Sequence, residues 1–323
     1  MISNFEPMFL VDGKNLYMTP RCIKKYLGPN KIYIPHQIAT GTRPAPAMRE
    51  DKLHPSIDIS TFKEIQKTKT HVVLQPEMPL DNNPARYCKI LVDLKAKTAA
   101  VLVKQSLFSN HNESRYKVGP VEVQCTETAF VLARQGVVYE EATNDEDRAH
   151  VCGITELSLV AESPFKSNSV TRGLRAGLFN KDIWDPVAEH HMTAALLLQY
   201  SQDPEAFNRA RDLKKMLVER YEVEHVAIAE VGTDNLTWQT GAGGDDTLAA
   251  LMEIEELTNE SAETVFKRLG GQNKFGRAYS VLWEAVEDYD TIEAFRAVVN
   301  YEIGPIVEIE EKVAEPEAKR ARV

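Results

Sequence analysis

The period of the hydrophobic pattern changes near residue 126, and this change restricts the chain to folds that combine strands with helices. From about residue 88, "CKILVDLKAKTAAVLVKQ" contains two β-prone runs, and "YKVGPVEVQ" predicts a short strand pattern around a Gly-Pro turn. From residue 126 to 142, "TETAFVLARQGVVYEEA" begins with a threonine that can cap a helix and then repeats apolar residues at helical spacing. We therefore expect an α+β domain that is rich in helix and has short strands.

The chain after this point continues the helical pattern, with one exception. "DIWDPVAEHHMTAALLLQYSQ", residues 182–202, predicts a long helix whose opening turn tolerates Pro186. "EHVAIAEVG", residues 224–232, predicts a short strand. The other helices are expected at residues 203–221, 246–257, 261–269, 274–288 and 290–302.

Prolines and charges divide the chain near residue 95. Ten of the 16 prolines fall in the first 100 residues, in stretches such as "GTRPAPAMREDKLHPS" that cannot form regular helix. Residues 1–100 hold 15 Lys and Arg against 9 Asp and Glu, whereas residues 101–323 hold 23 against 39. We expect a basic, irregular N-terminal extension or small domain at residues 1–95, which lies as an arm along the rest of the chain or along a second copy in a homo-oligomer.

Two further parts follow from this division. The folded domain is expected at residues 96–302, and it should remain folded without the extension that precedes it. The segment 303–323 is charged and has little apolar surface to bury, so we expect a disordered tail.

Composition and spacing exclude several classes of protein. No apolar run approaches the roughly 20 residues that span a bilayer, and the N-terminus lacks a signal-peptide pattern, so we expect a cytoplasmic or nuclear protein without a membrane partner. The net charge is −10 and no stripe of Lys and Arg with interleaved aromatic residues is present, which argues against a dedicated nucleic-acid surface. The four cysteines form no Cys-x-x-Cys pair, and the adjacent His190 and His191 point in different directions on a helix, so no metal site is expected.

The common catalytic motifs are absent, but several unusual segments follow one another in a distinctive order. The chain has no Walker loop, no Gly-x-Gly-x-x-Gly after a strand and no His-Glu-x-x-His helix. The unusual segments are "LFSNH" at 107–111, "TETAF" at 126–130, "DIWDPV" at 182–187, "DNLTWQTG" at 234–241 and "GGQNKFGRAYSVLWEAV" at 270–286.

This ordered set resembles the NADAR (NAD- and ADP-ribose-associated) family over about residues 100–288. The family pattern runs through a Ser-Asn-Phe segment, a Glu-His-Tyr-Phe helix, a Trp before a Met-rich helix, an Asp-x-x-Trp-Gly turn and a Gly-x-Asn-x-x-Gly helix start. The matching positions are Ser109, Asn110, Glu127, Trp184, Asp234, Trp238, Gly271, Asn273 and Gly276. The chain departs from the pattern at His111, which replaces the Phe, at Thr128 and Ala129, which replace the His-Tyr pair, and at the turn, which reads Trp-Gln-Thr-Gly.

The resemblance implies hydrolysis of an N-glycosidic bond, without a metal or another cofactor. The substrate would be ADP-ribose attached to a base, or a phosphoribosyl intermediate of riboflavin synthesis. Cleavage builds positive charge on the ribose carbon, so a carboxylate from Glu127 or Asp234 can stabilise that charge or draw a proton from the attacking water. By the same resemblance, the residues that bind the substrate are Ser109 and Asn110 at a ribose hydroxyl or base edge, Trp184 and Trp238 around the base, and the backbone N–H groups from Gly271 through Asn273 to Gly276 at a phosphate.

Each of these residues also has a purely structural interpretation. A glutamate in a first helical turn stabilises the helix dipole, a tryptophan anchors a core, and an Asp or Asn before a helix or turn serves as a cap. The departures from the family pattern favour a second function, a non-catalytic structural subunit of a large assembly such as a viral capsid. A true active site requires Glu127, Asp234, Trp238 and Asn110 to converge on one pocket.

Overall fold

A computed structural model of the chain describes a large part of the sequence. The described residues are 59–77, 87–104, 106, 108–118, 121–159, 161, 163–257, 273–297 and 299, together with the backbone of four short strands at 9–12, 15–18, 34–35 and 306–307. Most of the expected N-terminal extension, the helix expected at 261–269, Gly271 and most of the expected tail lie outside these residues.

A mixed five-stranded sheet forms the centre of the fold. Its strands are β4 (Phe62–Lys67), β5 (His71–Pro76), β6 (Tyr87–Asp93), β7 (Thr98–Lys104) and β10 (His225–Glu230). The strand order is β10-β7-β6-β5-β4, in which β10 runs parallel to β7 and the other neighbours are antiparallel. Because β7 and β10 are parallel, the chain between them makes a crossover connection, and the carboxyl ends of both strands lie at the same end of the sheet.

Three pairs of short strands lie outside this sheet. β1 (Phe9–Asp12) pairs with β2 (Asn15–Met18), and β8 (Tyr116–Val118) pairs with β9 (Val121–Val123), both antiparallel. β3 (Ile34–Pro35) pairs in parallel with β11 (Ile306–Val307).

Helices account for most of the chain after residue 125. They are α3 (Thr126–Glu141), α4 (Asp145–Leu159), α5 (Pro164–Val170), α6 (Lys181–Gln202), α7 (Pro204–Tyr221), α8 (Gly244–Leu257), α10 (Lys274–Glu287) and α11 (Ile292–Arg296), with 3-10 turns η2 (Ile59–Thr61) and η3 (Thr171–Gly173). Side-chain caps fix several of their starts, because Asn180, Asp203, Asn273 and Thr291 each accept hydrogen bonds from backbone N–H groups of the first turn. Among the described residues, no helix has the length and apolarity that crossing a membrane requires.

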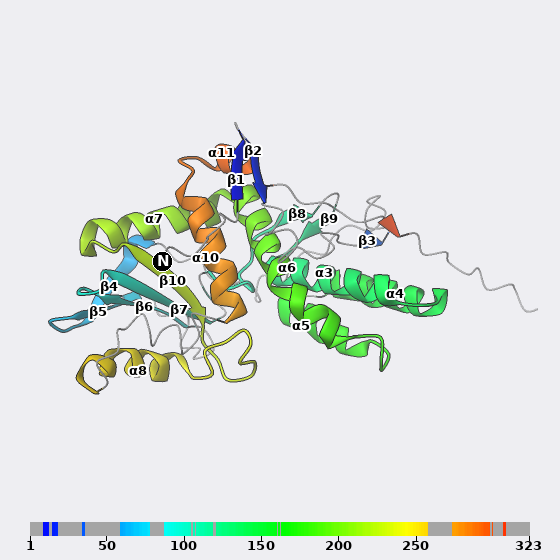
Figure 1. Cartoon of the computed structure of the whole chain (residues 1–323), viewed down its shortest axis with the longest axis horizontal. Helices are drawn as coiled ribbons and strands as arrows, with labels where there is room; N and C mark the ends of the chain where they lie inside the picture. The colour runs from blue at the N-terminus through cyan, green and yellow to red at the C-terminus, as the bar shows by residue number, and fades with distance from the viewer. Residues whose placement is uncertain are drawn as a thin grey trace, which may run out of the picture.

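The two faces of the sheet pack against different helices, as Figure 1 shows. Val72, Ile90 and Val101 point to one face and join the main core, to which α3, α6, α7 and α10 contribute. Val73 and Leu102 point to the other face and pack against α8. The alternation follows from the two-residue period of a strand, and burial on both faces explains why these strands are almost continuously apolar.

The structure is a mixed α/β fold with a mixed sheet, which agrees with the expected α+β class. The two β-prone runs after residue 88 form β6 and β7, and the strand expected at 224–232 forms β10. The expected helices from 126, 182, 203, 246 and 274 correspond to α3, α6, α7, α8 and α10. One detail differs, because Cys125 and not Thr126 is the N-cap residue of α3; the Thr126 hydroxyl is buried and donates to Gln199 on α6 instead.

The domain boundary drawn at residues 95 and 96 falls inside the central sheet. β4, β5 and β6 all precede residue 96, yet β6 pairs with β7 along its whole length and β5 pairs with β6. The boundary was misplaced because prolines flank β5, whereas its short apolar run "HVVL" is buried between the two layers of helices. The folded unit therefore includes residues 59–77 and 87–95, which the proline count assigned to the extension.

We predict that truncating a side chain of β5 will destabilise the whole fold. Leu74→Ala removes a side chain that is 0% exposed and should lower the free energy of unfolding by about 2–5 kcal/mol, measured by urea denaturation. Ile65→Ala on the neighbouring β4, where the side chain is 52% exposed, is the matched control and should change it by less than about 0.5 kcal/mol. Equal, small effects of both changes would mean that this hairpin is not part of the cooperative unit.

Candidate active site

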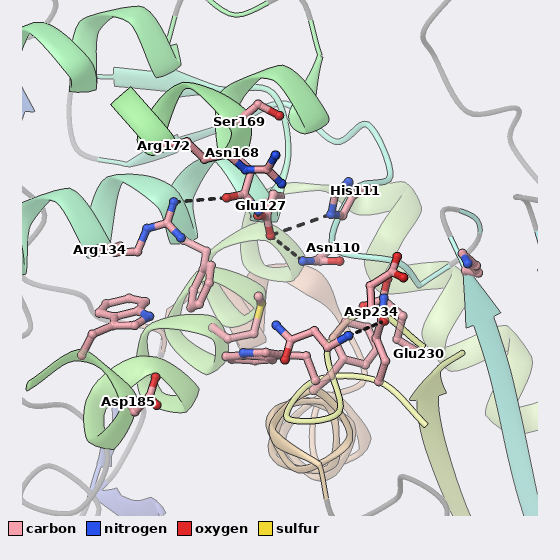
Figure 2. Close-up of a pocket in the computed structure, with 18 residues that line it drawn as sticks. Asn110, His111, Glu127, Arg134, Asn168, Ser169, Arg172, Asp185, Glu230 and Asp234 are labelled. Carbon is pink, nitrogen blue, oxygen red and sulfur yellow. Dashed lines mark hydrogen bonds and ion pairs between the residues drawn. The ribbon is translucent and has the colours of Figure 1, made fainter. Parts of the chain in front are cut away.

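A pocket of about 560 Å³ opens where the central sheet meets α3, α5 and α6 (Figure 2). This volume lies within the range of sites that hold small molecules. The pocket is lined by Lys104, Asn110, His111, Glu127, Phe130, Arg134, Asn168, Ser169, Arg172, Trp184, Asp185, Met192, Glu230, Asp234, Asn235, Trp238, Gln239 and Phe275. Five residues singled out in the sequence therefore meet here, namely Asn110, Glu127, Trp184, Asp234 and Trp238.

The Glu127 carboxyl is the most enclosed polar group of this pocket. It belongs to the first turn of α3 and the residue is only 4% exposed. Asn110 Nδ2 donates to one carboxyl oxygen at 2.7 Å, and Asn168 Nδ2 donates to the other at 2.7 Å. His111 Nε2 lies 3.9 Å from the oxygen that Asn110 contacts. Figure 2 shows Glu127 between Asn110 and His111 on one side and Asn168 on the other.

The loop after β7 holds Asn110 in place. The backbone N–H of Glu127 donates to the Asn110 carbonyl at 2.8 Å, which ties this loop to the start of α3. Phe108 has a φ of 65°, and its carbonyl accepts a hydrogen bond from the Tyr279 hydroxyl of α10. Ser109 does not line the pocket; its hydroxyl oxygen accepts from the His111 N–H at 3.2 Å and shapes the turn. The start of α3 and the Tyr279 hydroxyl of α10 therefore hold the loop that carries Asn110.

The amide groups of the two asparagines have fixed orientations. Asn168 Oδ1 accepts from Arg134 Nη2 at 3.1 Å, so its Nδ2 must be the atom that faces Glu127. Asn110 Nδ2 also faces Glu127, which leaves Asn110 Oδ1 buried and without a hydrogen-bond partner in the part of the chain that the structure describes. Such an acceptor in a pocket is suited to a hydroxyl or N–H group of a ligand.

Burial governs the protonation of Glu127. It raises the pKa of this carboxyl to about 7, because a carboxylate loses its hydration inside the protein. The Arg134 guanidinium and the amides of Asn110 and Asn168 favour the charged form and oppose this rise. A group with a pKa near neutrality is suited to exchange protons at physiological pH.

A second buried carboxyl, Glu230, lies in the same pocket and was missed by the sequence analysis. It is the last residue of β10 and is 8% exposed. Burial, together with the nearby negative charge of Glu127, raises its pKa to about 8, although Lys104 and a hydrogen bond from Gln239 act in the opposite direction. The sequence predicts β10 from its apolar residues, and a glutamate at the end of a strand is common. Nothing local in the sequence therefore indicated that Glu230 belongs to a site.

Asp234 occupies a more exposed position than Glu230. It lines the pocket from the turn after β10, where its carboxyl contacts the Thr233 hydroxyl at 3.5 Å. The two acids are four residues apart, yet only Glu230 is buried. The enclosed pair of carboxyls in this site is therefore Glu127 with Glu230.

The two tryptophans differ in their surroundings. Trp184 is 5% exposed and stacks on His191 at a ring distance of 5.5 Å, so most of its ring belongs to the core. Trp238 is half-buried, meets Phe130 edge to face at 5.2 Å, and has Lys274 Nζ 5.9 Å from its ring centre. Trp238 is the aromatic side chain with accessible ring surface, which makes it the better stacking platform.

The expected phosphate site at the start of α10 is organised as a helix cap. Asn273 is the N-cap residue, and its Oδ1 accepts from the Gly276 N–H at 2.8 Å. Neither residue lines the pocket, and Gly271 lies outside the described residues. Positive charge reaches the pocket instead from Lys104, Arg134 and Arg172.

In the described part of the chain, no group of three or more His, Cys, Asp or Glu side chains could hold a metal ion.

Comparison of the chain with protein-family models and with curated proteins finds no match. The site must therefore be interpreted from its own chemistry and from the motif order in the sequence.

The raised pKa of Glu230 predicts a pH-dependent cost in stability. The folded state holds this proton more tightly than the unfolded state, so the free energy of unfolding falls as pH rises from about 4.5 to about 8 and then levels off. Glu230→Gln cannot ionise and should avoid this loss. By urea denaturation, it should match the wild type near pH 4.5 and exceed it at pH 8.5 by more than about 1 kcal/mol.

The exposed Glu253 on α8 provides the control for this prediction. Glu253→Gln makes the same chemical change and should leave the pH dependence of unfolding as in the wild type. A Glu230→Gln variant that loses stability equally at both pH values would contradict the assignment of Glu230 as a buried, proton-holding carboxyl.

Proposed function

We propose that this protein is an N-glycosidase that hydrolyses the bond between ribose and a base in an ADP-ribosylated base or a related phosphoribosyl nucleotide. The observation that carries the proposal is the buried Glu127 carboxyl, held by two amide donors inside a pocket of nucleotide size. The order of motifs that resembles the NADAR family supports the same reaction class.

The chemistry of the bond explains why this arrangement is suitable. As the bond to the base breaks, positive charge develops on the ribose carbon and a water molecule attacks it. The ionised Glu127 carboxylate favours that charge and can accept a proton from the water. Asn110 and Asn168 fix the carboxylate by bonding to both oxygens, so little reorganisation is needed during the reaction.

The remaining pocket residues suit the other parts of a nucleotide. The half-buried Trp238 ring offers a face for a base, and the buried Asn110 Oδ1 offers an acceptor for a ribose hydroxyl. Lys104, Arg134 and Arg172 bring positive charge, which favours phosphate groups. No metal is required for these roles, since every group is supplied by the chain.

Two of the departures that favoured a non-catalytic subunit lie away from the pocket. Thr128 and Ala129 are both buried, and neither lines the pocket. The Thr128 hydroxyl contacts Cys125 Sγ at 3.5 Å. Because neither side chain lines the pocket, these two departures do not change the groups that face a ligand there. His111 and Gln239 do line the pocket and distinguish it from the family pattern.

The proposal predicts that Glu127→Gln will abolish turnover while ligand binding is kept. The amide keeps the shape of the carboxyl and loses its charge, so release of ADP-ribose from an ADP-ribosylated base should fall by about 10²–10⁴-fold, measured by chromatography. Binding of ADP-ribose, measured by calorimetry, should change far less. Glu141→Gln makes the same exchange at the exposed end of α3 and should retain wild-type turnover.

This experiment also separates the two functions. A wild type that releases nothing from ADP-ribosylated bases or phosphoribosyl nucleotides, and that assembles into large uniform particles by light scattering, would favour the structural subunit. Unchanged turnover in Glu127→Gln would remove this residue from the mechanism.

Trp238→Ala should behave differently from Glu127→Gln. A stacking surface contacts the base in the ground state as well as in the transition state, so its loss should weaken binding and lower kcat/KM together. We expect about 1–3 kcal/mol of lost binding free energy, measured by calorimetry with ADP-ribose conjugated to a base. Unchanged affinity in Trp238→Ala would mean that the base lies elsewhere.

A further inference from the structure

Backbone hydrogen bonds at the carboxyl end of β10 hold Glu230 where its side chain lines the pocket. Next to it, the Val231 N–H donates to the Val103 carbonyl at 2.8 Å, which continues the pairing of β10 with β7. The Glu230 carbonyl accepts from the Thr240 N–H at 3.0 Å, which brings the returning turn back onto the strand. The backbone of this residue is therefore fixed on both sides, and its side chain lines the pocket.

Gln239 gives this carboxyl a defined hydrogen-bond donor. Its Oε1 accepts from the Asn235 N–H at 3.3 Å, which leaves its Nε2 as the atom that donates to Glu230. The side chain lies directly on the backbone of Gly232, where an added Cβ would be 2.5 Å from Gln239 Oε1. A residue other than glycine at 232 would displace Gln239, so the turn is shaped around this contact.

Charged and titratable groups from several elements surround Glu230. Lys104 extends from the end of β7, Glu127 from α3 and Tyr279 from α10, and Asp234 lies on the turn. Two buried carboxyls of this kind do not both ionise readily, because each negative charge opposes the other. Glu127 is fixed by two amide donors and Arg134 favours its charge, so it ionises first and Glu230 keeps its proton.

We infer that Glu230 is the acid that protonates the leaving base, an assignment that rests on the proposed N-glycosidase function. The neutral carboxyl donates its proton to the base nitrogen as the bond from that nitrogen to the ribose carbon breaks and its electron pair moves to the nitrogen. Water forms the new bond to the ribose carbon and gives a proton to the Glu127 carboxylate. Exchange of protons with solvent then restores both carboxyls, so the net reaction consumes one water molecule.

The inference predicts that the need for Glu230 depends on the leaving group. In NAD⁺ the pyridinium ring leaves as a neutral molecule and needs no proton. A base joined to ADP-ribose through an amide or amine nitrogen leaves as an anion unless it is protonated. Glu230→Gln should therefore slow the second substrate by about 10²–10⁴-fold, while it changes the rate on NAD⁺ by less than about threefold.

Two variants serve as controls for this comparison. Glu127→Gln should slow both substrates, because both need the charge on the ribose carbon to be stabilised. Asp234→Asn, which alters the exposed acid of the same turn, should affect both substrates by the same factor. A selective loss in Asp234→Asn and none in Glu230→Gln would overturn the inference in favour of Asp234.

The pH profile of the wild type tests the inference without any substitution. With the amide- or amine-linked base, kcat/KM should fall at alkaline pH with a pKa near 8, whereas with NAD⁺ this alkaline fall should be absent. At acid pH, kcat/KM should fall with a pKa near 7 for both substrates, because both need the ionised Glu127. Identical profiles, or equal losses of both substrates in Glu230→Gln, would refute the role of Glu230 and leave the hydrolase function standing. A wild type inactive on both substrates would reject the function and the inference together.

Discussion

The buried Glu127 carboxyl is the interaction on which the rest of the site depends. Burial alone disfavours its charge, and the surrounding residues oppose that effect through the two asparagine amides, the Arg134 guanidinium and the start of α3. Asn110 comes from the loop after β7 and Asn168 from α5, so the site exists only when the sheet and the helices are assembled. The elevated pKa that results is the property a proton-transfer group needs.

The parallel pairing of β10 with β7 explains why two acids meet in one pocket. It brings the end of β10, with Glu230, to the same edge of the sheet as Lys104 and the loop that carries Asn110. The crossover between these strands contains α3, which delivers Glu127 from the helical layer. This arrangement lowers the stability of the fold as pH rises above the ordinary pKa of a glutamate, and such costs are typical of functional sites.

The sequence predicts the elements whose apolar residues repeat with a clear strand or helix period. The apolar runs of β6, β7 and β10 and the long helices α6 and α7 are of this kind. α4 was missed because two of its six buried residues, Thr155 and Ser158, are polar, which weakens the apolar period. Glu230, Arg134 and Asn168 were missed because their roles arise from tertiary contacts: a glutamate at a strand end and an asparagine on an unpredicted helix have no local signature.

A crystal structure of the protein soaked with ADP-ribose, the expected product, would test the role of Glu127. The anomeric hydroxyl of the ribose should lie within about 2.6–3.2 Å of the Glu127 carboxyl, beside the face of Trp238. A further ribose hydroxyl should donate to the buried oxygen of Asn110. ADP-ribose bound elsewhere, or this pocket left without it at saturating concentration, would contradict the proposed role of Glu127.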